Sequence, residues 1–178
     1  MNFPILSTLI FLPLLSSIFI FLSRDKPNNY SAIYISIFSS IATFLLSIFL
    51  WYSLDVNTAE FQFVEEQSWI NDFIKFKLGV DGISILFIVL TTFITPICIV
   101  SCINSVKTRV KEFLIAILIL ETFMIGVFCS LDLVIFYLFF EAGLIPMFLI
   151  IGVWGGPRRV YSAFKFFLFT LLGSVLML

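Results

Sequence analysis

Long apolar runs alternate with short polar segments along the whole chain. The runs lie at about 3–22, 31–52, 79–103, 112–130, 133–153 and 161–178. Each is about twenty residues long, and a helix of that length crosses the ~30 Å hydrocarbon core of a bilayer at ~1.5 Å per residue. The pattern predicts an all-α polytopic membrane protein with about six transmembrane helices, forming a single transmembrane region over residues 1–178.

Two segments depart from the simple alternation. The outer loop at 53–78 mixes acidic residues with aromatic and aliphatic ones, which predicts an ordered flap lying partly at the membrane interface. The last apolar run reaches Leu178 without a flanking charge or a polar tail, which is unusual for the end of a membrane helix. We therefore expect the sequence to be incomplete at its C-terminus, or to be one piece of a larger assembly.

Composition supports the membrane assignment and narrows the chemistry. Hydrophobic residues make up 61% of the chain, charged residues make up 12%, and the mean hydropathy is +1.18. The sequence contains no histidine, which excludes histidine-ligated haem, zinc or copper and a histidine general base. Cys98, Cys102 and Cys129 all lie in apolar stretches and lack the spacing of a metal cluster. We expect no cofactor and no metal in this chain.

The charged residues are segregated, and their segregation predicts an orientation. Eight of the ten basic residues fall in alternate connections or just inside the sixth run: Arg24, Lys26, Lys107, Arg109, Lys111, Arg158, Arg159 and Lys165. The opposite loop carries the acidic residues Asp55, Glu60, Glu65, Glu66 and Asp72. By the positive-inside rule the basic face is cytoplasmic, or on the matrix side of a mitochondrion, and the N-terminus is on the outer side.

Glu141 is the main candidate for function. It lies within the otherwise uncharged run 133–153, at a depth where a carboxyl group costs several kcal/mol to insert. Such residues usually face a protein interior or a water path and take part in moving ions or protons. Glu141 is therefore a candidate proton relay, and the alternative is a permanently protonated structural acid.

Glu121 is a second candidate for the relay. It lies ten residues before Leu131, and Glu141 lies ten residues after it. In an antiparallel helical hairpin both carboxyl groups would lie at about the same depth, ~15 Å from the turn. If they face each other, their protons would leave in coupled steps. Helix rotation decides this point, and the sequence leaves it open.

Other polar and helix-breaking residues bear on the roles of the two buried glutamates. Pro146 and Gly143 follow Glu141 closely, which predicts a kink where water could reach the carboxyl group, although membrane helices also tolerate such kinks for packing alone. Lys165 enters the sixth run from the basic side, so it either extends to the interface or modulates Glu141. Asp81 and Asp132 lie at the outer ends of runs and are expected to cap helices rather than carry protons.

Four segments resemble a known family. Gly79–Ser84, Leu90–Ile99, Phe136–Gly155 and Lys165–Ser174 resemble the N-terminal third of the subunit 4 (chain M) family of proton-pumping NADH:quinone oxidoreductase, respiratory complex I. The resemblance implies an antiporter-like subunit of the membrane arm, with roughly fourteen helices at full length. It also implies that Glu141 matches the family's essential fifth-helix glutamate, whose partner lysines would lie beyond Leu178.

The resemblance further implies where this chain works and what surrounds it. Its partners would be the other membrane-arm subunits and the lipid bilayer, with no nucleic acid. NADH, FMN, iron-sulfur clusters and ubiquinone would be used by partner subunits, and the membrane would be the mitochondrial or a bacterial inner membrane. Two other functions stay open: a subunit of a multi-subunit sodium/proton antiporter, and a purely structural membrane scaffold.

Overall fold

The structure, a computed structural model, describes residues 4–23, 30–55, 58, 60–70 and 74–177. Within these residues it contains six helices: α1 (Ile5–Leu22), α2 (Tyr30–Tyr52), α3 (Ser84–Ser105), α4 (Val110–Cys129), α5 (Leu133–Trp154) and α6 (Arg159–Met177). All six described helices are long and apolar enough to cross a membrane. The predicted class, a helical polytopic membrane protein, is confirmed.

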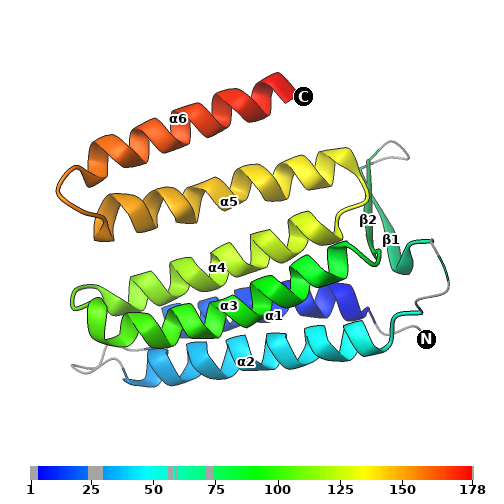
Figure 1. Ribbon diagram of the computed structural model, residues 1–178, viewed down its shortest axis with the longest axis horizontal. Coiled ribbons are helices and arrows are strands. Elements are labelled where there is room, and N and C mark those ends of the chain that lie inside the picture. The colour runs from blue at the N-terminus through cyan, green and yellow to red at the C-terminus, as the bar shows by residue number, and fades with distance from the viewer. Residues whose placement is uncertain (1–3, 24–29, 56–57, 59, 71–73, 178) are drawn as a thin grey trace.

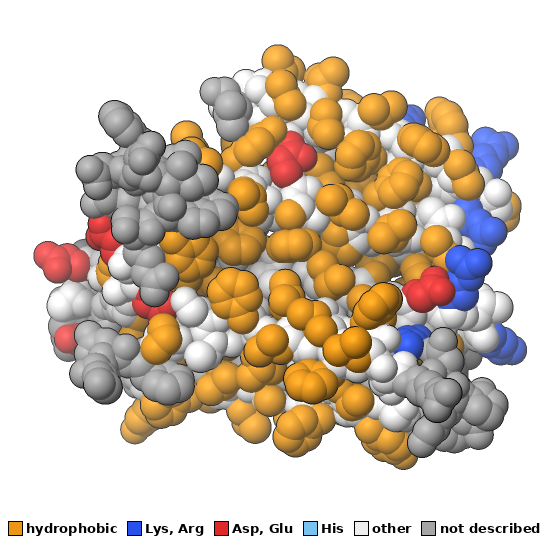
Figure 2. Space-filling view, turned by 180° about the vertical axis from the view of Figure 1, so that it is seen from behind, with side chains coloured by type: hydrophobic (Ala, Val, Ile, Leu, Met, Phe, Trp, Pro, Cys, Tyr) orange, Lys and Arg blue, Asp and Glu red, His pale blue; other side chains and the backbone are white. Residues whose placement is uncertain are grey.

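The helices lie side by side in one bundle, with α4 near its centre and α6 at one edge (Figure 1). α4 packs against α1, α3 and α5, while α6 packs against α5. Large apolar side chains cover much of the face of the bundle seen in Figure 2. Phe19, Phe38 and Phe169 are among the exposed apolar side chains of the bundle. An apolar surface of this extent is unfavourable in water and suits contact with lipid.

A β-hairpin lies at one end of the bundle, where the sequence predicted an outer loop at 53–78. Its strands, β1 (Gln62–Ile70) and β2 (Ile74–Val80), are antiparallel. Because β2 includes residues 79 and 80, α3 begins at Ser84 rather than at 79. Leu78 and Val80 of β2 are fully buried in the apolar core, which holds the strand on the bundle. Asp72, an acidic residue of the predicted loop, lies outside the described residues.

The hairpin is attached to the first helix and to the connection between α4 and α5. The backbone amides of Leu6 and Ser7 donate hydrogen bonds to the Glu65 carboxylate at 2.8 and 3.1 Å, and the Ser7 hydroxyl donates to the same group. On its other side, the amide of Leu131 donates to the carbonyl oxygen of Lys77 at 3.0 Å. A carboxylate at a helix N-terminus satisfies free N–H groups and complements the helix dipole. Glu65 therefore caps α1 from a distant strand.

The ends of α3 and α5 are capped by local aspartates, as the sequence predicted. Asp81 Oδ1 accepts a hydrogen bond from the Ser84 amide at 2.7 Å. Asp132 Oδ1 accepts from the amides of Val134 and Ile135 at 2.9 and 3.3 Å. Hydrogen bonds from the Ser84 side chain and backbone lower the pKa of Asp81 below its ordinary value of 3.8.

Basic side chains cap the C-terminal ends of α1 and α5, at the end of the bundle opposite the hairpin. Lys111 Nζ donates to the carbonyl oxygen of Ser23, which ends α1, at 2.7 Å. Arg159 donates to the carbonyl oxygen of Val153 near the end of α5, also at 2.7 Å. Figure 2 shows most Lys and Arg side chains gathered at this end and several acidic ones at the other. This separation supports the predicted orientation, although Arg24 and Lys26 lie outside the described residues.

Replacing the distant cap should destabilise the bundle. Glu65→Ala leaves the first amides of α1 without their acceptor, so we expect the free energy of unfolding to fall by about 1–2 kcal/mol. Glu60→Ala, which alters an exposed acidic residue of the same segment, is the matched control. Denaturant unfolding of the full-length protein in lipid or detergent measures both changes, and equal losses for the two variants would contradict the capping role.

The cap of α3 should make stability depend on pH. Because the pKa of Asp81 is lowered in the folded state, its contribution is fully present above the ordinary value of 3.8 and is lost as pH falls through the lowered folded value. Asp81→Asn removes this titration. We expect the stability difference between wild type and variant to be constant near neutral pH and to change below 3.8, as measured by thermal unfolding at each pH. A difference that does not vary with pH would contradict the assignment.

Candidate functional site

Glu121 is buried in the middle of α4, and only 2% of it is exposed. One carboxyl oxygen, Oε1, lies 3.1 Å from the hydroxyl oxygen of Thr43 on α2. Thr95 of α3 also interacts with this carboxyl group. The second oxygen, Oε2, has no hydrogen-bond partner among the described residues. The carboxyl group therefore points from α4 toward α2 and α3.

The hydroxyl groups beside Glu121 belong to a row on α2. We call this row the α2 hydroxyl stripe; its members, all buried, are Ser36, Ser39, Ser40, Thr43 and Ser47. At its far end the Ser47 and Thr92 hydroxyls are 2.7 Å apart, which joins the stripe to α3. The sequence analysis missed the stripe, although its spacing of three and four residues is the signal that marks one face of a helix.

Glu141 lies in the middle of α5 and is partly exposed. The hydroxyl of Ser174, which is buried on α6, donates a hydrogen bond to Glu141 Oε1. Tyr137, one turn earlier on α5, also interacts with this carboxyl group. α5 stays one continuous helix through Pro146, and Gly143 faces Phe123 of α4. Glu141 thus points from α5 toward α6.

The two carboxyl groups are turned in different directions. α4 and α5 pack against each other, with α3 on one side of the pair and α6 on the other (Figure 1). The hydrogen-bond partner of Glu121 lies on α2, and that of Glu141 lies on α6. Helix rotation, which the sequence left open, therefore gives each carboxyl group its own surroundings.

Lys165 is exposed near the start of α6, and within the described part of the chain no ion pair involves it. It lies nine residues before Ser174, or ~13 Å along the helix axis, so it is not beside Glu141 in this structure. Its position near the basic end fits a side chain that extends to the interface. Its role as a modulator of Glu141 stays a prediction.

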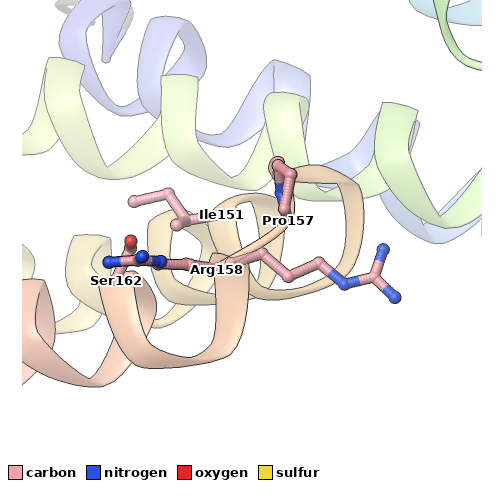
Figure 3. A pocket seen from close by; sticks show the side chains of 7 residues that line it. Ile151, Pro157, Arg158 and Ser162 are labelled. Carbon is pink, nitrogen blue, oxygen red and sulfur yellow. The ribbon is translucent and has the colours of Figure 1, made fainter.

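An open hollow of about 440 Å³ lies where the chain turns from α5 into α6. Figure 3 shows Ile151, Pro157, Arg158 and Ser162 around it. It is on the basic end of the bundle and includes neither buried glutamate. In the described residues no group of three or more Cys, Asp or Glu side chains could hold a metal ion.

The chain is similar to known membrane proteins in both its sequence and its fold. Residues 130–178, which carry Glu141, Lys165 and Ser174, match the family model described as NADH:quinone oxidoreductase/Mrp antiporter, TM. The fold is similar to a chain of respiratory complex I from Thermus thermophilus, with a TM-score of 0.78, 25% identity, and coverage of 95% of this chain and 33% of that one. A chain of an archaeal membrane-bound sulfane sulfur reductase has the same fold, with a TM-score of 0.76 at 21% identity. The protein therefore has the antiporter-like membrane fold.

The curated relatives of this chain are subunits of one kind, called subunit M in bacteria and chain 4 in plants. The chain is 54% identical to NADH-quinone oxidoreductase subunit M of Rhodobacter capsulatus over 98% of its length, and 52% identical to NADH-ubiquinone oxidoreductase chain 4 of Marchantia polymorpha over 97%. It spans about a third of these relatives, 34% and 35% of their lengths. The chain is thus similar over nearly its whole length to subunit M and chain 4 proteins, and the resemblance predicted from the sequence is confirmed.

The contact between Glu141 and Ser174 should be measurable as a coupling between α5 and α6. We expect a double-mutant cycle with Glu141→Leu, which removes the acceptor, and Ser174→Ala to give an interaction energy of about 1 kcal/mol, typical of hydrogen bonds between membrane helices. Unfolding of the full-length protein in lipid or detergent provides the four stabilities. A second cycle with Glu141→Leu and Thr170→Val, a hydroxyl that donates within its own helix, should give a value near zero. Equal coupling in both cycles would contradict a specific contact.

Proposed function

We propose that this chain is part of a proton-translocating membrane-arm subunit of NADH:quinone oxidoreductase, in which Glu141 gains and loses a proton. The observation that carries the proposal is a carboxyl group in the middle of a membrane-crossing helix, hydrogen-bonded to α6 within the segment that matches the family model. The names of the curated relatives supply the reaction that would drive proton movement.

The surroundings of Glu141 suit a group that changes its charge. The Ser174 hydroxyl oxygen lies within hydrogen-bonding distance of both Glu141 Oε1 and the Leu171 carbonyl oxygen, which is 2.9 Å away. A hydroxyl has a single proton, so it donates to one acceptor at a time. When Glu141 is ionised, Ser174 donates to the carboxylate; when Glu141 is protonated, Ser174 can donate to Leu171 and accept from the acid. Both charge states therefore keep a hydrogen bond.

A neighbouring cation would set the direction of transfer. A positive charge near the carboxylate stabilises the ionised form, and its withdrawal favours proton uptake. The resemblance to the family implies that such lysines lie beyond Leu178, while Lys165 is the candidate within this chain. The partly exposed Glu141 lies at the α5–α6 contact rather than in the sealed core.

The subunit would work within a multi-subunit assembly embedded in a membrane. Other membrane-arm subunits would flank the chain, and NADH, FMN, iron-sulfur clusters and ubiquinone would be used by those partners. The membrane would be the mitochondrial inner membrane or a bacterial inner membrane, since the relatives come from both bacteria and plants.

A sodium/proton antiporter subunit is the second candidate, because the description of the matching family model also names Mrp antiporters. The curated relatives favour the oxidoreductase, since the proteins of Rhodobacter capsulatus and Marchantia polymorpha are both named as its subunits. Proton movement that follows NADH oxidation indicates the oxidoreductase, whereas movement that follows an imposed sodium gradient indicates the antiporter.

The central test is Glu141→Gln in the intact complex. Glutamine keeps the shape and can still accept the Ser174 hydrogen bond, but it cannot exchange a proton. We expect proton pumping coupled to NADH oxidation to be largely lost while the amount of assembled complex is unchanged. Glu112→Gln, which alters an exposed carboxylate near Arg109 at the basic end, should pump normally. Near-normal pumping by Glu141→Gln would eliminate the proposed role.

A further inference from the structure

Glu121 is a buried carboxyl group that the proposed role of Glu141 does not use. Two buried polar atoms in its neighbourhood have no hydrogen-bond partner among the described residues: Glu121 Oε2 and the hydroxyl oxygen of Ser39. Ser39 lies one turn from Thr43, the residue that contacts Glu121. Buried polar atoms are almost always paired, so unpaired ones call for a water molecule, an ion or a functional role.

The hydrogen bonds of Thr43 limit the charge states that Glu121 can adopt. Its hydroxyl oxygen lies 2.9 Å from the Ser40 carbonyl oxygen and 3.1 Å from Glu121 Oε1. Both of those atoms are acceptors when the carboxyl group is ionised, yet the hydroxyl has one proton. Both contacts are satisfied together only if Glu121 is protonated and donates to Thr43 while Thr43 donates to Ser40. The geometry at rest therefore fits a neutral carboxylic acid.

The α2 hydroxyl stripe supplies further acceptors on both sides of Thr43. Ser36, Ser40 and Ser47 each donate to a carbonyl oxygen three residues earlier in their own helix, at 2.7 to 3.0 Å. Because their protons are used inside the helix, these hydroxyls present lone pairs to the interior. From Ser36 to Ser47 the stripe extends over eleven residues, or ~16 Å along α2. That length is about half of the hydrocarbon core.

We propose that Glu121 is a second proton-binding site, separate from Glu141, which exchanges its proton along the α2 hydroxyl stripe through Thr43 and Ser39. In one exchange the proton leaves the carboxyl group for a water molecule, and the Thr43 hydroxyl rotates so that its proton moves from the Ser40 carbonyl oxygen to Glu121 Oε1. One proton is transferred and no electron moves. The inference rests on the proposed function, because it assumes that the chain crosses a membrane in a proton-translocating subunit. It makes the carboxyl group of Glu121 a proton-exchanging group that is independent of Glu141.

The arrangement of the site favours a proton over a metal cation as its occupant. The carboxyl group interacts with the hydroxyls of Thr43 and Thr95, and both hydroxyls already donate to backbone carbonyl oxygens. The carboxyl group of Glu141, on the neighbouring helix α5, is turned toward α6 and away from this site. A proton also requires no rearrangement of ligands, whereas a cation would require several oxygens around it.

Infrared difference spectroscopy of the intact complex on exchange into deuterated water tests the proposal. We expect Glu121→Gln to remove one carboxylic-acid band from the wild-type difference spectrum. Thr43→Val, which keeps the shape and removes the hydroxyl, should shift this band to higher frequency and slow its exchange, because the acid loses its acceptor and its path. Thr43→Ser should restore both properties, and Ser39→Ala should slow exchange without the shift.

Two control variants show whether the changes in the Glu121 band are specific to this site. One tests the loss of any buried hydroxyl, and the other tests the role of Glu141. Thr122→Val removes a buried hydroxyl from α4 that donates to Leu118, and it should leave the Glu121 band unchanged. Glu141→Gln should remove a different band and leave that of Glu121 in place, so either site can fail the test alone. The inference would be overturned if Glu121→Gln removed no acid band, if Thr43→Val neither shifted the band nor slowed its exchange, or if the band responded to sodium and not to deuterium.

Discussion

A polar group inside the bilayer has no water to bind, so the protein itself must supply its partner, and this constraint explains most of the buried polar contacts. Hydroxyl groups in the helices donate to carbonyl oxygens three or four residues earlier, as Thr92, Thr122 and Thr170 do. A carboxyl group has no such local partner. Glu121 and Glu141 therefore reach hydroxyls on other helices, and these contacts set which faces of α4 and α5 meet which neighbours.

The same constraint applies at the helix ends, where unpaired backbone groups meet the interface. At the acidic end, aspartates cap α3 and α5 locally, and Glu65 caps α1 from the hairpin. At the basic end, Lys111 and Arg159 donate to the final carbonyl oxygens of α1 and α5. The charges that predict the orientation of the chain are thus also hydrogen-bonding partners of the helices.

The class of fold could be predicted from the sequence because membrane spans depend on length and hydropathy alone. The caps Asp81 and Asp132 were also predictable, since capping is local. The hairpin was missed because the alternation of its strands is interrupted by register shifts, one of them beside Phe63, which has a positive φ of 54°. The partners of Glu121 and Glu65 depend on helix rotation and on contacts between distant segments, and runs that are apolar on all sides carry no periodic signal for rotation.

Close packing between α4 and α5 fixes how the two buried carboxyl groups are related. A methyl group on Gly126 would lie 2.7 Å from the ring of Phe139, so a glycine is needed for the two helices to approach this closely. Such tightly packed helices resist sliding past each other. Glu121 and Glu141 are thus attached to one rigid pair but face opposite neighbours, so a charge change at one acts on the other mainly through the electric field, which is weakly screened inside the membrane. Movement of α6 would alter the hydrogen bond of Glu141 directly, while that of Glu121 depends on α2.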